Sequence, residues 1–463
     1  MEYLDIAVKK NNRFQKKHEK ENMIDPRMIS IVQDFIIQNQ LICYGGIAIN
    51  NILPKDSQFY DYDIDIPDYD FFSKDAMKHA EELCDIFSKE EFVYHVEAKS
   101  AFFYGTYKVF VNFIPIADIT QIHDEFYDRL IKTAIVVENI PYTHPDFLRM
   151  SLHQELSRPL GDVSRWEKIY TRMNILNRYY PVTRKAREIT GIQSLNDTVK
   201  EELKRIVNTM IDCDCIFNNM ALIKCLYKKY MSRKTSKNIT CKKLNIRDRI
   251  LQDQFITYTQ NMNDVNKSLR LLNIEGLEIK EKQSIYKFVK KYEEVFVNNT
   301  FVGIIFELDS CMSYHKYTAK SKTIHVGNID TVLHLYFTLV LMNDISINTN
   351  HVYDTISYLY EIIMNYEALY LKYLQEKDEK NQPKELIRFN LPCLGNQSGY
   401  VDILKERFKK FKELKKRRNT IEYKQWFFKY IPQQNKNKRQ DKTTPKRAKR
   451  IKNKTLRKSS KLN

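Results

Sequence analysis

The chain has 463 residues, 43% of them hydrophobic, which is enough apolar material for the cores of two or three domains. Its longest apolar runs, such as residues 335–342, are too short to span a bilayer, and no apolar stretch follows the early lysines. These features exclude an ordinary membrane protein and predict no secretion signal.

The formal net charge is +18, and its distribution along the chain is uneven. Residues 436–463 hold 13 Lys and Arg against Asp441 alone, a net charge of +12. With few apolar side chains to bury, residues 433–463 are predicted to form a disordered basic tail. Such a tail serves either targeting and solubility or contact with phosphates, and the basic sequence before it favours phosphates.

The first elements form a strand, a glycine pair and a helix. Asp25 and Pro26 are typical of a helix start, and apolar residues at helical spacing predict a helix to about Gln40. The apolar run LICY then predicts a short strand, and IAINNIL predicts a helix directly after Gly45-Gly46. A glycine pair at such a junction lets backbone N–H groups approach a phosphate, although it is more often just a tight turn.

The stretch FYDYDIDIPDYDFFS, residues 59–73, holds five aspartates in two groups that Pro67 separates. Clustered carboxylates repel one another, so this stretch requires either a cation or open solvent. Ser73 is expected to cap a helix whose apolar stripe runs from Ala76 to Phe87. The acidic segment therefore ends where a helix begins.

The rest of the chain predicts an α+β protein. Residues 92–96 and 106–120 are expected to be strands, with Pro115 either breaking the second into two strands or marking a sheet edge, in a mixed domain that ends near residue 180. Residues 197–290 are expected to form Lys-rich amphipathic helices, followed by strands at FVGIIFELDS and KTIHVGNI and a helix that Asp330 caps. No repeat of fixed period is visible, so a second α+β domain is the simplest prediction.

Aspartates two apart on a strand point to one face, where they can hold two divalent cations together. Asp118 lies within the apolar sequence IADIT, and a charge at such a place is costly unless it is paired or bound to metal. It is the candidate third ligand. The alternative is a structural aspartate that pairs with a lysine or caps a turn.

Taken in order, these features resemble the nucleotidyltransferase superfamily of DNA polymerase β-like enzymes. The phrases CYGGIAIN, IPDYDFFS, GTYKVFV, IADIT, HPDFLRMSLHQELSRP and GDVSRWEKIY are similar to the poly(A) polymerase catalytic subunits of large nucleocytoplasmic DNA viruses. The resemblance covers residues 25–185 well and the remainder loosely. It implies an N-terminal arm (1–24), a nucleotidyltransferase catalytic domain (25–190) and a helical and α+β domain (191–432), the last a nucleotidyltransferase-like fold without activity.

Two aspartate pairs compete for the metal-binding role. Asp63 and Asp65 fit the bare pattern at least as well and lie closer to the glycine pair. Asp68 and Asp70 are favoured because they lie directly before the next helix, whereas the first pair precedes Pro67, which interrupts a strand ladder. PDYDFFS is also the phrase that is similar to the viral family's metal-binding motif.

Fixed positive charge for a triphosphate is expected from the phrases ELSRP and SRWEK, which contain Ser157, Arg158, Arg165 and Lys168. For each of these side chains an ordinary surface role is the alternative. Glu307 and Asp309 have acidic spacing as well, but they lack a glycine pair upstream and are interpreted as structural. The segment 405–430 combines Lys and Arg with aromatic residues, which suits phosphate contact and base stacking, or else inward packing of the aromatics.

The resemblance implies a template-independent enzyme that adds AMP from ATP to RNA 3′ ends with two Mg²⁺ or Mn²⁺ ions. Asp68 and Asp70 would hold both ions, and Asp118 would hold the ion at the primer hydroxyl. The alternatives are a terminal transferase that adds CCA, U or G, and an inactive RNA-binding scaffold. The same resemblance implies single-stranded RNA and ATP as partners, action in the host cytoplasm or the virion, and processivity from a homodimer or a partner subunit.

Overall fold

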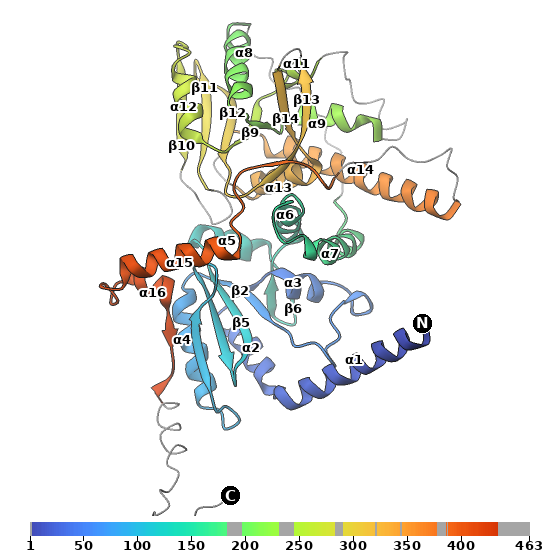
Figure 1. Cartoon of the computed structure of the whole chain (residues 1–463), viewed down its shortest axis with the longest axis vertical. Helices are drawn as coiled ribbons and strands as arrows, with labels where there is room; N and C mark the ends of the chain where they lie inside the picture. Colours follow the sequence, from blue (N-terminus) through green and yellow to red (C-terminus); the bar gives the residue numbers. More distant parts are fainter. Residues whose placement is uncertain are drawn as a thin grey trace, which may run out of the picture.

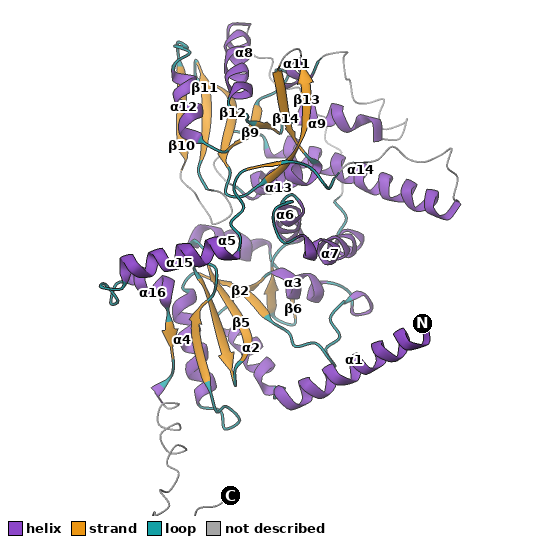
Figure 2. Ribbon diagram, in the orientation of Figure 1, coloured by secondary structure: helices purple, strands orange, loops and turns teal. Residues whose placement is uncertain are grey.

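The computed structural model describes residues 2–182, 197–230, 245–282, 290–319, 322–342, 345–376, 386 and 388–433. Two eight-stranded sheets, each accompanied by helices, form two α+β domains that lie one above the other in Figures 1 and 2. The predicted fold class is therefore confirmed. The predicted domain boundary near residue 190 and residues 434–463 of the predicted tail lie outside the described residues.

The first domain contains most of the elements that the sequence predicts. Its elements are α1 (Glu2–Met23), α2 (Arg27–Gln38), β1 (Ile42–Cys43), α3 (Gly45–Ile52), a 3₁₀ turn η1 (Lys55–Ser57), β2 (Tyr69–Ser73), α4 (Ala76–Ser88), β3 (Val96–Ser100), β4 (Thr106–Val111), β5 (Ile114–Gln121), α5 (Asp124–Thr133), β6 (Ile135–Val137), β7 (Ile140–Tyr142), α6 (Pro145–Leu156), η2 (Val163–Arg165) and α7 (Trp166–Tyr179). The segment predicted as an N-terminal arm is thus the helix α1.

Three local predictions in this domain were wrong. The strand expected at residues 92–96 is β3, which begins only at Val96. The cap of α4 is Asp75, whose carboxylate accepts from Lys78 N, because Ser73 is still part of β2. Pro115 does not break the long strand. The chain turns at Asn112 and Phe113, which both have positive φ, and Pro115 lies within β5 opposite Phe110 beside a bulge. A turn with left-handed residues therefore closes this hairpin.

The second domain contains α8 (Asp197–Asp212), β8 (Ile216–Phe217), α9 (Met220–Tyr227), η3 (Lys228–Tyr230), α11 (Ile246–Ile250), β9 (Phe255–Thr259), α12 (Met262–Arg270), β10 (Leu277–Lys282), β11 (Tyr292–Val297), β12 (Thr300–Glu307), β13 (Met312–Ala319), β14 (Lys322–Gly327), α13 (Ile329–Leu341), α14 (Thr349–Glu376) and β15 (Cys393–Leu394). Residues 197–290 therefore include three strands that the helical prediction missed. The cap of α13 is Asn328, since Asp330 lies inside the helix and is fully buried.

The second domain repeats the strand order of the first. The first sheet runs β16-β3-β4-β5-β2-β1-β7-β6, and the second runs β10-β11-β12-β9-β8-β14-β13-β15. Apart from β16 and β15 at the ends, each neighbour pair has the same sense in both sheets: β2 is parallel to β5 and antiparallel to β1, as β9 is parallel to β12 and antiparallel to β8. The same sheet topology is thus present twice.

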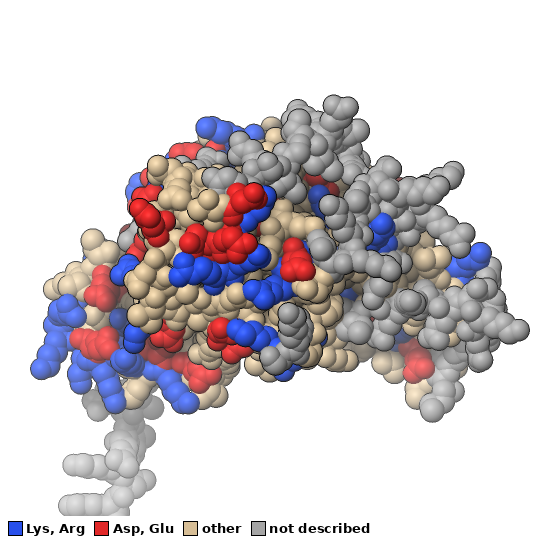
Figure 3. Space-filling model, turned by 90° about the horizontal axis from the view of Figure 1, so that it is seen from above, with Lys and Arg blue, Asp and Glu red and all other residues tan. Residues whose placement is uncertain are grey.

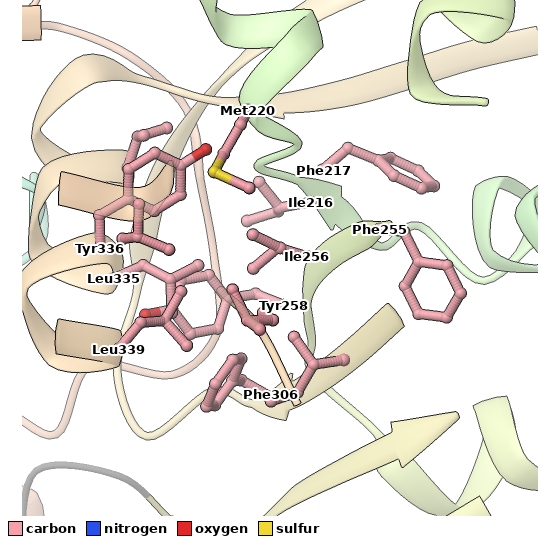
Figure 4. Close-up of a cluster of buried hydrophobic side chains, with 14 of the residues drawn as sticks. Ile216, Phe217, Met220, Phe255, Ile256, Tyr258, Phe306, Leu335, Tyr336 and Leu339 are labelled. Atoms are coloured by element: carbon pink, nitrogen blue, oxygen red, sulfur yellow. The ribbon is translucent and has the colours of Figure 1, made fainter. Parts of the chain in front are cut away.

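Apolar side chains fill the second domain and hold it against the first. In Figure 4, side chains of β8, β9 and β12 meet Leu335, Tyr336 and Leu339 of α13. The helices α6 and α13 follow equivalent strands in the two domains, and they pack against each other at the domain interface. There the imidazole of His153 is hydrogen bonded to both Asp330 (2.8 Å) and Tyr360 (2.7 Å).

The last described elements return to the first domain. They are α15 (Tyr400–Leu414), α16 (Ile421–Phe427) and β16 (Lys429–Tyr430), and β16 pairs with the free edge of β3. In Figure 1 this segment lies beside the first sheet rather than the second. Residues 400–430, which the sequence assigned to the C-terminal domain, therefore pack on the first domain. None of the helices in the described ranges has the length and apolar composition needed to cross a bilayer.

Candidate active site

The three predicted aspartates lie together at one end of the first sheet. Asp70 of β2 is the direct neighbour of Asp118 on the parallel strand β5, and Asp68 precedes Asp70 by two residues. Asp68 and Asp70 therefore project to the same face. Both line a pocket of about 450 Å³, whose opposite wall is formed by α3, α6 and α7.

Burial and mutual repulsion make these carboxylates unusually difficult to ionise. Burial, followed by the charges of Asp68 and Asp118, raises the pKa of Asp70 to about 8. The pKa of Asp68 is raised by desolvation and then by Asp118, and burial raises the pKa of Asp118. At neutral pH the three side chains therefore favour a bound cation or a retained proton.

Lys108 supplies the positive charge nearest to this group. From β4 its ammonium lies 2.6 Å from one oxygen of Asp118, and the other oxygen, Oδ1, is buried with no hydrogen-bond partner. In this conformation no cluster of three or more His, Cys, Asp or Glu side chains in the described part of the chain has a geometry ready to hold a metal ion. The buried Oδ1 and the repelling carboxylates nevertheless fit a divalent cation, because hard oxygen donors without partners are what such ions bind.

The glycine pair brings the start of α3 against Asp70. Gly45 has φ +71°, and a Cβ at this position would lie 3.0 Å from Oδ2 of Asp70. A Cβ on Gly46 would lie 2.6 Å from both the guanidinium of Arg172 and the hydroxyl of Tyr60. Larger residues would therefore close the space between the aspartates and the N-terminus of α3, whose N–H groups suit an anion.

A cationic face lines the far wall of the pocket. It consists of Arg165, Lys168 and Arg172, which follow one another at helical spacing on η2 and α7. Repulsion from Arg172, more than burial and Arg165, lowers the pKa of Lys168. Two acids are close enough to offset part of this charge: Glu155 lies 3.4 Å from Arg165, and Asp65 acts on Lys168. Three crowded cations opposite a glycine turn favour a polyanionic ligand.

Two of the residues predicted to contact the triphosphate lie elsewhere. Ser157 is fully buried, donates to the carbonyl of Gln154 and contacts the sulfur of Met312. Arg158 lies 3.7 Å from Asp309 of the second domain. Neither side chain lines the pocket, because the chain after α6 turns towards the domain interface. Of the predicted residues, Gly45, Gly46, Asp68, Asp70, Arg165 and Lys168 do line it.

The first aspartate group forms a loop outside the pocket. The N–H of Asp61 donates to Asp65, the N–H of Asp63 donates to Asp61, and Arg13 of α1 forms an ion pair with Asp61 at 2.8 Å. The carboxylates of Asp61 and Asp65 are thus engaged by turn hydrogen bonds and, for Asp61, by α1. Within this conformation Asp68 and Asp70 are the pair placed beside Asp118.

The second domain lacks acids at the equivalent positions. Tyr44 N donates to the carbonyl of Asp70 (2.9 Å), just as Asn218 N donates to that of Ile256 (2.7 Å). Ile256 is paired with Ile304, as Asp70 is paired with Asp118. Glu307 lies three residues beyond Ile304, near the far end of β12. The second copy therefore carries two isoleucines where the first carries aspartates.

Lys108 and Arg172 were not predicted as site residues. The phrase GTYKVFV includes Lys108, but only the pairing of β4 with β5 places it opposite Asp118. Arg172 follows Lys168 by four residues, so a continuation of the helical spacing from Arg165 and Lys168 would have found it. Phe103 and Tyr104, which also line the pocket, gave no comparable signal.

Comparison with known proteins identifies relatives of this site. Residues 30–162 match the family model described as "Poly(A) polymerase catalytic subunit". A "Putative poly(A) polymerase catalytic subunit" of African swine fever virus is 30% identical over 185 residues, which is 38% of this chain and 38% of that protein. A protein of Acanthamoeba polyphaga mimivirus with the same description is 34% identical over 161 residues, 34% of this chain and 26% of the mimivirus protein.

The matched segment thus spans well under half of these relatives. The fold extends further: the crystal structure of the Megavirus polyadenylate synthase superposes with a TM-score of 0.73 at 19% identity, over 95% of this chain and 89% of that one. These matches confirm the resemblance to the viral poly(A) polymerase catalytic subunits, which the family model locates in residues 30–162.

Proposed function

We propose that this chain is a polynucleotide adenylyltransferase that adds AMP from ATP to RNA 3′ ends without a template. The observation that carries the proposal is that Asp68 and Asp70 line one pocket together with a glycine turn and a cationic face, while Asp118 lies beside Asp70 on the neighbouring strand. This arrangement suits a nucleotide whose phosphates lie between carboxylates and fixed positive charge.

The triphosphate of ATP would lie between α3 and α7. Backbone N–H groups at the start of α3 and the side chains of Arg165, Lys168 and Arg172 would hold its oxygens. Ser157 and Arg158 are not included, because both point to the domain interface. Positioning by fixed charges is the main contribution that a protein makes to phosphoryl-type transfer.

Asp68, Asp70 and Asp118 would hold two divalent cations, Mg²⁺ or Mn²⁺. Such ions lower the pKa of the attacking hydroxyl and neutralise charge on the leaving pyrophosphate. In the reaction the primer 3′ oxygen forms a bond to the α-phosphorus while the bond to the bridging oxygen breaks in line. Before binding, Lys108 holds Asp118 in place, and it would have to give up its contact with one carboxylate oxygen.

Two other functions make different predictions. A terminal transferase for another nucleotide would share the same site, and the choice of ATP rests on the similarity to the viral family. An inactive scaffold would have no reason to retain three carboxylates at a cost to stability, as the isoleucines of the second domain illustrate.

The test is a primer-extension assay with purified full-length chain, a short single-stranded RNA, Mg²⁺ or Mn²⁺ and each nucleoside triphosphate in turn. The expected result is extension with ATP, loss of extension in Asp70→Asn, and retention in the matched control Asp63→Asn. Extension with UTP or GTP instead would favour a terminal transferase for another nucleotide. Activity in Asp70→Asn together with loss in Asp63→Asn would move the site to the first aspartate group.

A further inference from the structure

The pocket walls on the two sides of the aspartates carry different kinds of side chain. The strand order places Asp118 of β5 between Asp70 of β2 and β4. On the β2 side lie the glycine turn and the cationic face. On the β4 side lies the loop 101–105, whose Phe103 and Tyr104 form that wall of the pocket. If the triphosphate takes the cationic side, the other side remains for the RNA end.

The loop 101–105 is held in place by the C-terminal elements. Arg407 of α15 donates to the carbonyl of Ala101 (2.7 Å) and to that of Trp426 (3.1 Å). One guanidinium thus ties the loop to α15 and to the end of α16. The hydroxyl of Ser100 also donates to Trp426 O (2.9 Å), next to the pairing of β16 with β3.

Aromatic contacts complete the attachment and leave one ring exposed. Phe102 stacks on Tyr400 with ring centroids 4.8 Å apart and an interplanar angle of 8°. The ring of Tyr104 lies 4.7 Å from that of Trp426. Between these anchored neighbours Phe103 is 66% exposed. An aromatic ring fixed at a pocket rim and left open to solvent is suited to stacking against a planar ligand.

The exposed aromatics continue from the loop along α15. Tyr400 is 67% exposed and Phe408 is 59% exposed, with the ammonium of Lys412 lying 4.4 Å above the Phe408 ring. We call Phe103, Tyr104, Tyr400 and Phe408 the aromatic ledge. It begins at the pocket and extends onto a helix some 300 residues later in the chain, so it exists only because α15 returns to the first domain.

The charge around the ledge is strongly positive. Residues 400–430 contain eleven Lys and Arg against four acidic residues. Viewed from above, Lys and Arg gather on the side of the molecule where Figure 1 places α15 and α16 (Figure 3). A basic surface with exposed aromatic rings is the composition that binds single-stranded nucleic acid without sequence preference. The ledge also adjoins the aspartate pocket, which an RNA end must reach and a protein partner need not. This position favours RNA over a protein as the ligand.

We propose that the single-stranded 3′ segment of the RNA runs along the aromatic ledge, with one base stacked on Phe103 and phosphates on the lysines of α15. The proposal rests on the function proposed above, since it takes the pocket as the site where the RNA end reacts. Arg407 is a positioning residue that keeps the loop at the pocket rim. Because stacking does not distinguish bases, the ledge accepts any single-stranded sequence.

The test measures binding of a fluorescent single-stranded RNA by anisotropy, in parallel with primer extension by the wild-type chain. Phe103→Ala is expected to weaken binding about 5- to 150-fold, the range found when a base loses one stacking partner. Phe14→Ala is the matched control, because Phe14 is 69% exposed on α1, away from the pocket lining. It should bind RNA and extend primers as the wild type does.

Salt dependence separates stacking from charge. Phe103→Ala should leave the slope of log affinity against log salt unchanged, because phenylalanine contacts no phosphate as an ion. The double variant Lys409→Gln and Lys416→Gln should make the slope shallower by about 1.4, at about 0.7 for each phosphate lost from a single strand. Both lysines are exposed on or just beyond α15.

An RNA with an abasic nucleotide near its 3′ end allows a double-mutant cycle between that base and Phe103. Loss of that base should weaken binding to the wild type but not further weaken binding to Phe103→Ala. Three results would each refute RNA binding on the aromatic ledge. They are additive losses from the two changes, equal RNA affinity of Phe103→Ala and wild type, and duplex RNA that binds as tightly as single-stranded RNA. Absence of extension by a wild-type chain that does bind at Phe103 would overturn the proposed function instead, so the two failures are distinguishable.

Discussion

The raised pKa of Asp70 predicts a measurable dependence of stability on pH in the absence of a bound metal ion. The folded-state pKa of Asp70 is about 8 against its ordinary value of 3.8. Because the folded value is the higher one, the stability from the protonated carboxyl is complete below pH 4 and is lost progressively as the pH rises from about 4 to about 8. At about 1.4 kcal/mol for each pKa unit, the loss amounts to about 4 kcal/mol at pH 7.

Asp70→Asn removes this ionisation while keeping the shape of the side chain. In EDTA, the unfolding free energy of Asp70→Asn minus that of the wild type should therefore increase by about 1.4 kcal/mol for each pH unit between 5 and 8. Urea unfolding of both proteins at four pH values measures the difference. Asp63→Asn, in the exposed loop, is the control and should parallel the wild type. A difference that stays constant with pH would refute the assignment of the raised pKa to Asp70.

Three further substitutions test other parts of the molecule. Asp118→Asn should lower the single-turnover rate far more than the affinity for ATP, because charge develops at the primer hydroxyl in the transition state; a changed ATP dissociation constant with an unchanged rate would count against that role. Arg172→Ala should weaken ATP binding about 10- to 100-fold through loss of a charged hydrogen bond, whereas Arg178→Ala on the exposed end of the same helix should not. Asp330→Ala should lower the unfolding free energy by about 3–5 kcal/mol in urea, since it leaves a buried arginine uncompensated; a loss below about 1 kcal/mol would contradict this account.

The strands and the glycine turn that form the candidate site could be predicted from the sequence because their signals are local. The strand, glycine pair and helix around Gly45 lie within residues 42–52, and Asp70 and Asp118 each lie on a strand that its own apolar neighbours predict. The direction of the side chains after α6 could not be predicted in this way. Whether Arg158 faces the pocket or Asp309 depends on the packing of a second domain.

The packing of residues 400–430 on the first domain could not be predicted from the sequence either. The pairing of Lys429 with Lys99 joins strands that are distant in the sequence, and the strands themselves carry no pattern that selects this partner. The basic and aromatic composition predicted a nucleic-acid surface, but not its position. That position comes from Arg407, whose role is visible only once α15 lies against the loop 101–105.

No internal repeat is visible in the sequence, and only the family resemblance implied a second copy of the fold, because strand order, not residue type, is what the two copies share. Its isoleucines at the aspartate positions are understandable from the position of α6. One face of this helix, with Leu148, Ser151 and Glu155, lines the pocket, while the other, with Met150 and His153, packs on α13.

The equivalent helix of the second copy thus covers the apolar back of an active-site wall. That contact requires the core and α13 of the second copy, but no carboxylates at its strand ends. Acids there would retain the repulsion described for Asp68, Asp70 and Asp118 without a ligand to relieve it, so isoleucine is the more stable choice once the copy serves as a support.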